Sequence, residues 1–363
     1  MSDQRGGGIA WTEQTWNPVR GCSRVSEGCR NCYAESVARR FSGPGQPYEG
    51  LVEIGTKGAR WNGRTKFVVE HLEDPLRWKR PRMVFVNSMS DLFHESLTND
   101  EIAAVFGVMA SAPHHTFQVL TKRPERARLW FRWMSEQAGG ARVHALYSAL
   151  QTLEPGMDGP MHSKWCGDPS GPWPLSNVWL GVSVEDQMSA DARIPLLLET
   201  PAAVRWVSYE PALGPVDFRK VPTFNRTSTN LYGWWVIVGG ESGPGARPMH
   251  PQWVRALRDQ CSAAGVPFLF KQWGEWAEYD SDFREPDGSH RLVQIGPRGS
   301  APPSSWQPGV SALISDRGHF VKHHDHMRDG IAYRHIVRVG KAAAGRTLDG
   351  VIHDGYPGEV SGG

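Results

Sequence analysis

Three cysteines near the start of the sequence are the residues best suited to carry chemistry. Cys22, Cys29 and Cys32 have the spacing C-x6-C-x2-C, in a segment bounded by Gly21 and Gly28. Thiolates are soft ligands for zinc or iron, and glycines let several sulfurs converge without steric cost. Three ligands are one fewer than a closed zinc or iron–sulfur site uses. We therefore predict an iron–sulfur cluster with one iron open to another molecule.

Two other interpretations of these cysteines stay open. A structural zinc site could be completed by Cys166, Cys261 or a histidine. The thiols could also be buried and unligated. The total of five cysteines is odd and fits a reducing compartment better than a disulfide framework.

The composition excludes several classes of protein. The 363 residues include 40 Lys and Arg and 38 Asp and Glu, so the net charge is close to zero. This balance excludes a protein whose main function depends on a polybasic nucleic-acid-coating surface or an acidic tail. With 39% hydrophobic and 21% charged residues, the chain is typical of neither disordered nor membrane proteins. It has no apolar signal sequence at its start and no stretch near about 18 apolar residues. We expect a soluble cytoplasmic protein.

Short apolar segments separated by helical patterns predict an α/β fold. The helical patterns are clearest over 99–110 and 251–264, which combine a cap with regularly spaced apolar residues. The strand-like segments are nearly continuous in apolar residues, as expected for strands covered on both faces. Repeated strand–helix units predict a parallel sheet or a partial or complete TIM-like β/α barrel. The predicted strands are 83–86, 116–120, 178–182, 204–207, 234–238 and 267–270, with a first strand around 12–17.

Two segments interrupt this pattern. Residues 138–176 and 279–320 are rich in Gly, Pro, Ser and Asp and have no sustained period, so we predict inserted loops there. We expect the barrel domain to span 1–276 and an irregular C-terminal extension to span 277–363. A histidine-rich run at 323–326 could bind a metal, but a solvent-exposed polar run is the favoured interpretation.

Polar residues follow the predicted strands. In parallel α/β folds, active sites lie at the carboxyl edge of the sheet, so we expect this set to line a pocket. Helix caps and turn residues are the alternative, because Ser, Asn and Asp begin helices for local reasons. The candidates are Ser88, Asp91, Lys122, Ser183, Glu185, Glu210 and Glu241.

Several of these motifs resemble a known superfamily. The segments 29–34, 87–93 and 120–124 resemble the radical S-adenosylmethionine (SAM) superfamily, and most closely its branch containing spore photoproduct lyase. A longer series of motifs is similar to the three-Cys-motif family of unknown function that is common in bacteriophages and prophages. That series comprises 16–18, 181–185, 239–243, 271–276 and 345–350.

The resemblance implies a fold of the radical SAM barrel type and a specific cofactor pair. Cys22, Cys29 and Cys32 would hold a 4Fe-4S cluster, and SAM would chelate the fourth iron. One electron, from a donor such as flavodoxin or ferredoxin, would cleave the sulfonium of SAM to methionine and a 5′-deoxyadenosyl radical that takes a hydrogen atom from the substrate. The protein would bind and aim these cofactors and exclude water. A phage context also implies the host cytoplasm and a phage-encoded partner.

The same resemblance implies roles for individual residues. Tyr33, directly after the last cysteine, would pack against SAM. Serine hydroxyls and a lysine ammonium suit ribose hydroxyls and a methionyl carboxylate. For Lys122 the alternative is a surface lysine at a helix start. The strand-end partners of SAM would be Ser88, Lys122 and Ser183, with Asp91, Glu185, Glu210 and Glu241 as further candidates for SAM or substrate contacts.

The sequence departs from the superfamily pattern in three places. The first cysteine gap has six residues where three are usual. Asn31 stands before the last cysteine, where an aromatic residue is common. The run Gly239-Gly240-Glu241 follows a much later strand than the Gly-Gly-Glu run that usually binds the SAM amino group.

A basic segment suggests the substrate class. Residues 57–82 contain eight basic and three acidic residues, with Trp61 and Trp78 among them. Basic residues with stacking aromatics are typical of sites for single-stranded or flipped nucleic acid. The alternative is a solvated basic flank with core tryptophans. We predict an enzyme acting on a nucleobase, nucleotide or nucleic acid. The competing hypotheses are a non-catalytic phage accessory or nucleic-acid-binding protein with structural zinc, and a radical SAM protein acting on a peptide or metabolite.

Overall fold

The computed structural model describes residues 9–56, 58–155, 168–221, 224, 233–278, 311–318, 320–321 and 333–358. By its internal contacts the chain divides into two compact units. The first comprises residues 1–183 and 193–206, and the second comprises 184–192 and 207–363.

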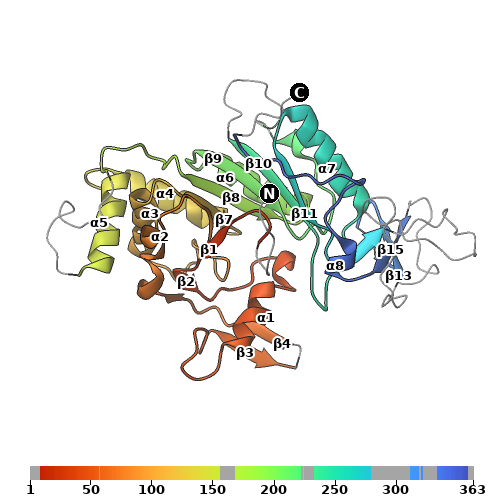
Figure 1. Ribbon diagram of the computed structural model, residues 1–363, viewed down its shortest axis with the longest axis horizontal. Helices are drawn as coiled ribbons and strands as arrows, with labels where there is room; N and C mark the ends of the chain where they lie inside the picture. Colours follow the sequence, from red (N-terminus) through yellow and green to blue (C-terminus); the bar gives the residue numbers. More distant parts are fainter. Residues whose placement is uncertain are drawn as a thin grey trace, which may run out of the picture. The chain divides into compact units, whose positions relative to one another are not determined.

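A seven-stranded sheet is the main structural element (Figure 1). The pairs β1–β6, β6–β7, β7–β8 and β10–β11 are parallel. The strands in spatial order are β1 (Gln14–Trp16), β6 (Met83–Val86), β7 (Thr116–Thr121), β8 (Val178–Val184), β9 (Val204–Tyr209), β10 (Trp234–Gly239) and β11 (Phe268–Gln272). The prediction of a mixed α/β fold is confirmed at this level, because the sheet is consistent with a partial β/α barrel.

The strands form where the sequence has continuous apolar runs. Every residue of β10 is buried, and only Trp179 of β8 is not fully buried. A strand covered on both faces needs apolar side chains in both directions, which explains the lack of alternation. All seven predicted strand positions are confirmed to within a few residues.

The helices begin and end at recognisable signals. Thr98 and Glu101 form a capping box at the start of α3, and Gly265, with φ +65°, ends α7. No helix within the described part of the chain is long and apolar enough to cross a membrane. The α-helices are α1 (Tyr33–Arg40), α2 (Asp74–Arg77), α3 (Asn99–Ser111), α4 (Pro124–Ser135), α5 (Ala141–Leu153), α6 (Gln187–Leu198), α7 (Pro251–Ala264) and α8 (Lys341–Ala344), and the 3-10 helices are η1 (Glu27–Cys29), η2 (Val69–His71) and η3 (Phe218–Lys220).

The expected loop at 138–176 is wrong in its first part, because α5 lies there. Ala145 and Ala149 of α5 pack against Gly107 of α3, where an added Cβ would lie 2.1 Å from the Ala145 carbonyl oxygen. The helix depends on this tertiary contact, and its apolar face is built largely of alanines, which give a weak sequence signal. Residues 156–167 lie outside the described residues.

Smaller antiparallel sheets complete the fold. The C-terminal extension is not irregular as predicted, because strands Trp276–Glu278 and Ser311–Ser315 both pair with Tyr333–Arg338 across long sequence separations, such as Trp276 with Arg338. Such non-local pairing has no local sequence signal. The histidine-rich run at 323–326 lies outside the described residues. The remaining strands are β2 (Val19–Arg20) with β5 (Lys66–Phe67), β3 (Val52–Gly55) with β4 (Gly58–Trp61), and β12 (Trp276–Glu278), β15 (Tyr333–Arg338), β13 (Ser311–Ser315) and β14 (Phe320–Val321) in that order.

Candidate metal centre

The cysteine loop begins at a glycine that no other residue could replace without strain. Gly21 follows β2 with φ +89°, and a Cβ there would lie 2.3 Å from the Arg64 carbonyl oxygen. Gly21 also forms a parallel bridge with Ser90, just beyond β6. The chain then passes through Cys22, continues through η1, which ends at Cys29, and reaches Cys32, the N-cap of α1. All three cysteines are free and partly buried.

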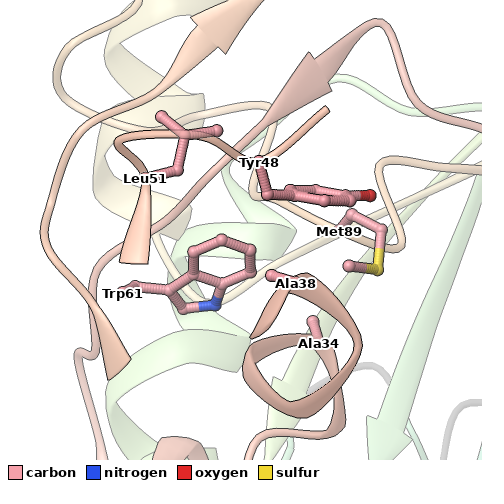
Figure 2. Packing of buried hydrophobic residues seen from close by; sticks show 6 residues of the cluster. All are labelled: Ala34, Ala38, Tyr48, Leu51, Trp61 and Met89. Atoms are coloured by element: carbon pink, nitrogen blue, oxygen red, sulfur yellow. The ribbon is translucent and has the colours of Figure 1, made fainter. Parts of the chain in front are cut away.

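A small apolar core supports the loop (Figure 2). It comprises residues of α1, of the segment between α1 and β3, of β4 and of the segment after β6, and Cys22 and Cys32 pack against it. In Figure 2, the rings of Trp61 and Tyr48 lie over the alanines of α1. Packing against this core therefore restrains two of the three cysteines. The core residues are Ala34, Ala38, Tyr48, Leu51, Trp61 and Met89.

A buried carboxylate connects the loop to this core. Glu35 of α1 is 3% exposed and accepts a hydrogen bond of 2.9 Å from Arg24 Nε and a second from the other end of the guanidinium. Its Oε1 also accepts the Trp61 backbone N–H over 3.0 Å. Fork-like pairing of a guanidinium with a carboxylate restricts both side chains. Glu35 thus holds the segment between Cys22 and Cys29 against α1 and β4.

Each of the three sulfurs has a hydrogen-bonding group beside it. Arg123 Nη1 donates to Cys22 Sγ over 3.8 Å, and the Ser26 hydroxyl lies 3.9 Å from Cys29 Sγ. Burial raises the pKa of Cys32, and hydrogen bonds from the first backbone N–H groups of α1 to its sulfur oppose that rise. A metal-bound thiolate has no hydrogen and can only accept, so these groups would donate to it. Hydrogen bonds to the sulfurs are a recurring feature of iron–sulfur sites, so the chemistry of these donors, as distinct from the arrangement of the sulfurs, is of the kind that such a site uses.

Without a cation, the thiols of Cys22 and Cys32 hold their protons. Burial raises the pKa of Cys22 to about 12, and the Asp91 carboxylate adds to this, while Arg123 opposes it. Burial also raises the pKa of Cys32 and outweighs the N–H groups of α1. Metal binding would have to displace these protons, so we expect it to strengthen as pH rises.

Arg123 lies at the centre of the polar contacts around Cys22. Its Nε donates to both oxygens of Glu95, over 2.9 and 3.0 Å. Its Nη2 donates to Ser23 Oγ over 2.6 Å and to the Ser23 carbonyl over 3.2 Å. Its Nη1 lies 3.4 Å from Asp91 Oδ2 in addition to Cys22. The guanidinium is buried, and every one of its nitrogens has a partner.

Asp91 joins the ends of two strands. Its Oδ1 accepts from the Thr121 hydroxyl over 2.8 Å and from the Phe93 N–H over 3.0 Å, and its Oδ2 accepts the Lys122 N–H over 3.0 Å. The residue is 6% exposed. These bonds hold the turn after β6 against the end of β7. A direct contact between Asp91 and SAM stays a prediction.

A histidine completes the surroundings of the loop. Ser96 N–H donates to His94 Nδ1 over 3.2 Å, so that nitrogen carries a lone pair. Nε2 then carries the proton and donates to Ser23 Oγ over 3.0 Å. Burial lowers the pKa of His94, and the charge of Arg123 lowers it further. His94 is therefore neutral at neutral pH and holds Ser23 in place.

The other predicted residues of the first unit lie at strand ends. Tyr33 is 52% exposed, and its hydroxyl donates to the Ser88 carbonyl over 2.6 Å. Ser88 Oγ donates to Asn17 Oδ1 over 3.1 Å. Lys122 is half-buried at the end of β7. Ser183, in β8, is buried. The structure therefore brings Tyr33 and Ser88 together and places Lys122 beside Arg123.

The remaining predicted residues belong to the second unit. Glu210 Oε1 lies 2.9 Å from Lys271 Nζ. Glu241 is buried and accepts from Arg247 Nε over 3.0 Å and from Arg247 Nη2 over 2.7 Å. Glu185 is buried too, and its backbone N–H donates to Ser189 Oγ over 2.8 Å. Glu210 and Glu241 therefore each have a cationic partner from the protein.

Comparison with known proteins places the chain in a family. The family model described as "Protein of unknown function (DUF5131)" matches residues 6–357. The chain belongs to the DUF5131 family. Neither the curated proteins nor the solved structures contain a significant match. Because this family description carries no activity, the radical SAM assignment stays a prediction for this DUF5131 chain.

The described part of this DUF5131 chain contains no group of three or more His, Cys, Asp or Glu side chains arranged to hold a metal ion. The metal centre therefore also stays a prediction. Of the two cysteines considered as a fourth zinc ligand, Cys261 is fully buried in α7, and burial raises its pKa strongly. Cys166 lies outside the described residues.

The two tryptophans of the basic segment have structural positions. Trp61 is 8% exposed and belongs to the core under the cysteine loop. Trp78 is half-buried, its ring packs edge-on against His115, and the Arg82 guanidinium lies 5.7 Å from its centroid. For these residues the structure favours the alternative of core tryptophans over a stacking surface.

Sequence reasoning missed Arg123, Glu35 and His94. Arg123 stands within the motif Thr121-Lys122-Arg123-Pro124, where Lys122 attracted the assignment. Pro124 begins α4, which places Arg123 in the tight turn after β7. A signal was therefore present, since a charged residue between a strand end and a helix-starting proline is well placed to turn toward the edge of the sheet.

Proposed function

We propose that this protein is a radical SAM enzyme whose 4Fe-4S cluster is held by Cys22, Cys29 and Cys32. The observation that carries the proposal is the environment of the three free thiols. They lie in one loop, two of them pack against a small apolar core, and each sulfur has a hydrogen-bonding group beside it. When bound, a reduced cluster and SAM supply a radical able to abstract a hydrogen atom.

The chain's own residues would prepare the site for this chemistry. Glu35 and Arg24 hold the long first cysteine gap in a defined shape. The Tyr33 hydroxyl is bound to the Ser88 carbonyl, so its exposed ring is fixed beside the cysteine loop. Lys122, at the end of β7, is our candidate for the methionyl carboxylate of SAM. Asp91 positions the Lys122 backbone through a 3.0 Å bond.

Anaerobic reconstitution tests the proposal directly. We expect about four irons and four sulfides per chain, and 5′-deoxyadenosine after reduction in the presence of SAM. Cys29→Ala should lose the iron, while Cys261→Ala, which changes a buried thiol of α7, should retain it. Colourless protein with one zinc would contradict the proposal and favour a structural metal.

We further propose a nucleotide or nucleic acid as substrate. Support comes from positively charged side chains near the cysteine loop. Arg39 and Arg40 are exposed on the last turn of α1, and Arg20 pairs with Lys66 across the β2–β5 sheet, which places two further cations side by side. The exposed ring of Phe41 follows directly. Arginines that neutralise phosphates and exposed aromatic rings together suit single-stranded nucleic acid.

A salt series tests the substrate class. The binding constant for single-stranded DNA or RNA should fall steeply with salt, and Arg39→Ala with Arg40→Ala should reduce the slope of log K against log salt by about 1 to 2. Arg219→Ala is the matched control, since Arg219 is exposed in the second unit and paired with Asp217. Salt-independent binding would favour a peptide or a small metabolite instead.

A further inference from the structure

Arg123 has a pattern of contacts that a purely structural arginine does not need. Its Nε reaches Glu95 and its Nη2 reaches Ser23, while its Nη1 reaches both Asp91 and the sulfur of Cys22. A buried arginine is already neutralised by one carboxylate. The additional contacts attach the first residues of the cysteine loop to the turn after β7.

We infer that Arg123 is a positioning residue that places Cys22 for metal binding and sets the reduction potential of the metal group through its hydrogen bond to the sulfur. The inference rests on the proposed function. The N–H donor stabilises negative charge on the sulfur, and this charge is largest in the reduced state. A donor at this sulfur therefore favours reduction.

The negative charges of Asp91 and Glu95 oppose the effect of Arg123 on the reduction potential. Glu95 is exposed on its outer side, with 64% of its side chain accessible, yet it binds Arg123 through both oxygens. Its negative charge offsets part of the positive charge that Cys22 experiences. Removing the charge of Glu95 while keeping Arg123 should therefore make the reduction potential more positive, whereas removing Arg123 should make it more negative.

Four variants test the inference on the full-length reconstituted protein. Arg123→Met should lower iron retention against a chelator by about 10- to 100-fold and shift the midpoint potential, measured by EPR-monitored titration, to a more negative value. Arg123→Lys should recover part of the potential, because it keeps the charge. Glu95→Gln should shift the potential in the positive direction. Arg126→Met is the matched control, since Arg126 lies in the first turn of α4, directly after Arg123, but binds Leu97 and Asn99.

A second measurement does not depend on the cluster. In metal-free protein, Arg123→Met should speed amide hydrogen exchange in residues 22–29 by about tenfold, while Arg126→Met leaves it unchanged. Unchanged exchange in this loop, or a wild-type potential in both Arg123→Met and Glu95→Gln, would overturn the inference. A wild-type protein that assembles no cluster would contradict the proposed function instead, and loop exchange would then decide the role of Arg123.

Discussion

At the scale of single residues, buried carboxylates organise the cysteine loop. Glu35 and Asp91 are both almost inaccessible, and between them they accept hydrogen bonds from Arg24, the Trp61 backbone, Thr121 and other groups. A buried acceptor that loses its partners costs far more than an exposed ion pair gains. The stability of the loop therefore depends on these two residues more than on its many surface charges.

Glu35→Gln tests this view. The change removes the charge that pairs with Arg24, and we expect a loss of about 2 kcal/mol in the free energy of unfolding, measured by urea titration. Glu27→Gln is the control in the same loop, because Glu27 and Arg30 are exposed and 3.9 Å apart. It should cost less than about 0.5 kcal/mol. Equal effects of the two changes would show that burial of Glu35 is not decisive.

The candidate site was only partly predictable at this scale. The three cysteines stand out because their spacing in the sequence is short. The contact of Arg123 with Ser23 and Cys22 spans about a hundred residues and depends on where β7 ends relative to the cysteine loop. No local pattern encodes that proximity. The hydrogen bonds that Asp91 accepts from Thr121 and Lys122 also join residues about 30 positions apart, so the sequence did not indicate them either.

At the scale of elements, the start of α7 contains a pH-sensitive cap. His250 is the N-cap, and its Nδ1 accepts the Gln252 N–H over 3.1 Å. Burial lowers the pKa of His250 to about 4, and the charge of Arg334 contributes. Protonation at Nδ1 would remove the cap and place a positive charge at a helix N-terminus, which the helix dipole disfavours.

The sign of the resulting pH dependence follows from linkage. The unfolded chain, with an ordinary histidine pKa near 6.5, binds the proton before the folded chain does. Stability from His250 is therefore complete above about pH 6.5 and falls by up to about 3 kcal/mol as the pH approaches 4. His250→Asn keeps a capping acceptor and should flatten this part of the stability profile.

The contact between α3 and α5 gives a second test at this scale. Gly107→Ala would place a methyl group 2.1 Å from the Ala145 carbonyl and 2.7 Å from the Ala149 Cβ, so the helices would have to separate. We expect a loss of about 1 to 3 kcal/mol in the free energy of unfolding. Gly43→Ala is the control, because its Cβ would meet only the Gln46 side chain at 3.7 Å. Unchanged stability in Gly107→Ala would contradict the close packing of the two helices.

Elements with a local signal were predictable, and those that depend on partners were not. Strands β6 to β11 are apolar runs bounded by polar residues, and α7 has the predicted bounds because both of its ends carry cap signals. By contrast, α5 forms where Gly107 of α3 allows the two helices to approach closely, and the C-terminal sheet forms because β12 pairs with the distant strand β15. Tertiary contacts decide these elements, so sequence periodicity alone missed them.

At the scale of the whole molecule, the fold should not depend on the metal. The buried residues of the seven-stranded sheet lie in apolar strands, whereas the cysteines occupy a loop backed by a small separate core. Removing the metal from reconstituted protein with a chelator should leave the far-UV circular dichroism unchanged and lower the melting temperature by only a few degrees. Complete unfolding on chelation would instead indicate a structural metal, as in small zinc domains.

The most direct test of the account is EPR spectroscopy of the anaerobically reconstituted and reduced protein, with and without SAM. The account predicts the signal of a reduced 4Fe-4S cluster, and SAM should change that signal because it binds the iron that lacks a cysteine ligand. A protein that holds one zinc and no iron would contradict the central claim. A cluster whose signal SAM does not alter would contradict it equally, because all of its irons would then be closed to SAM.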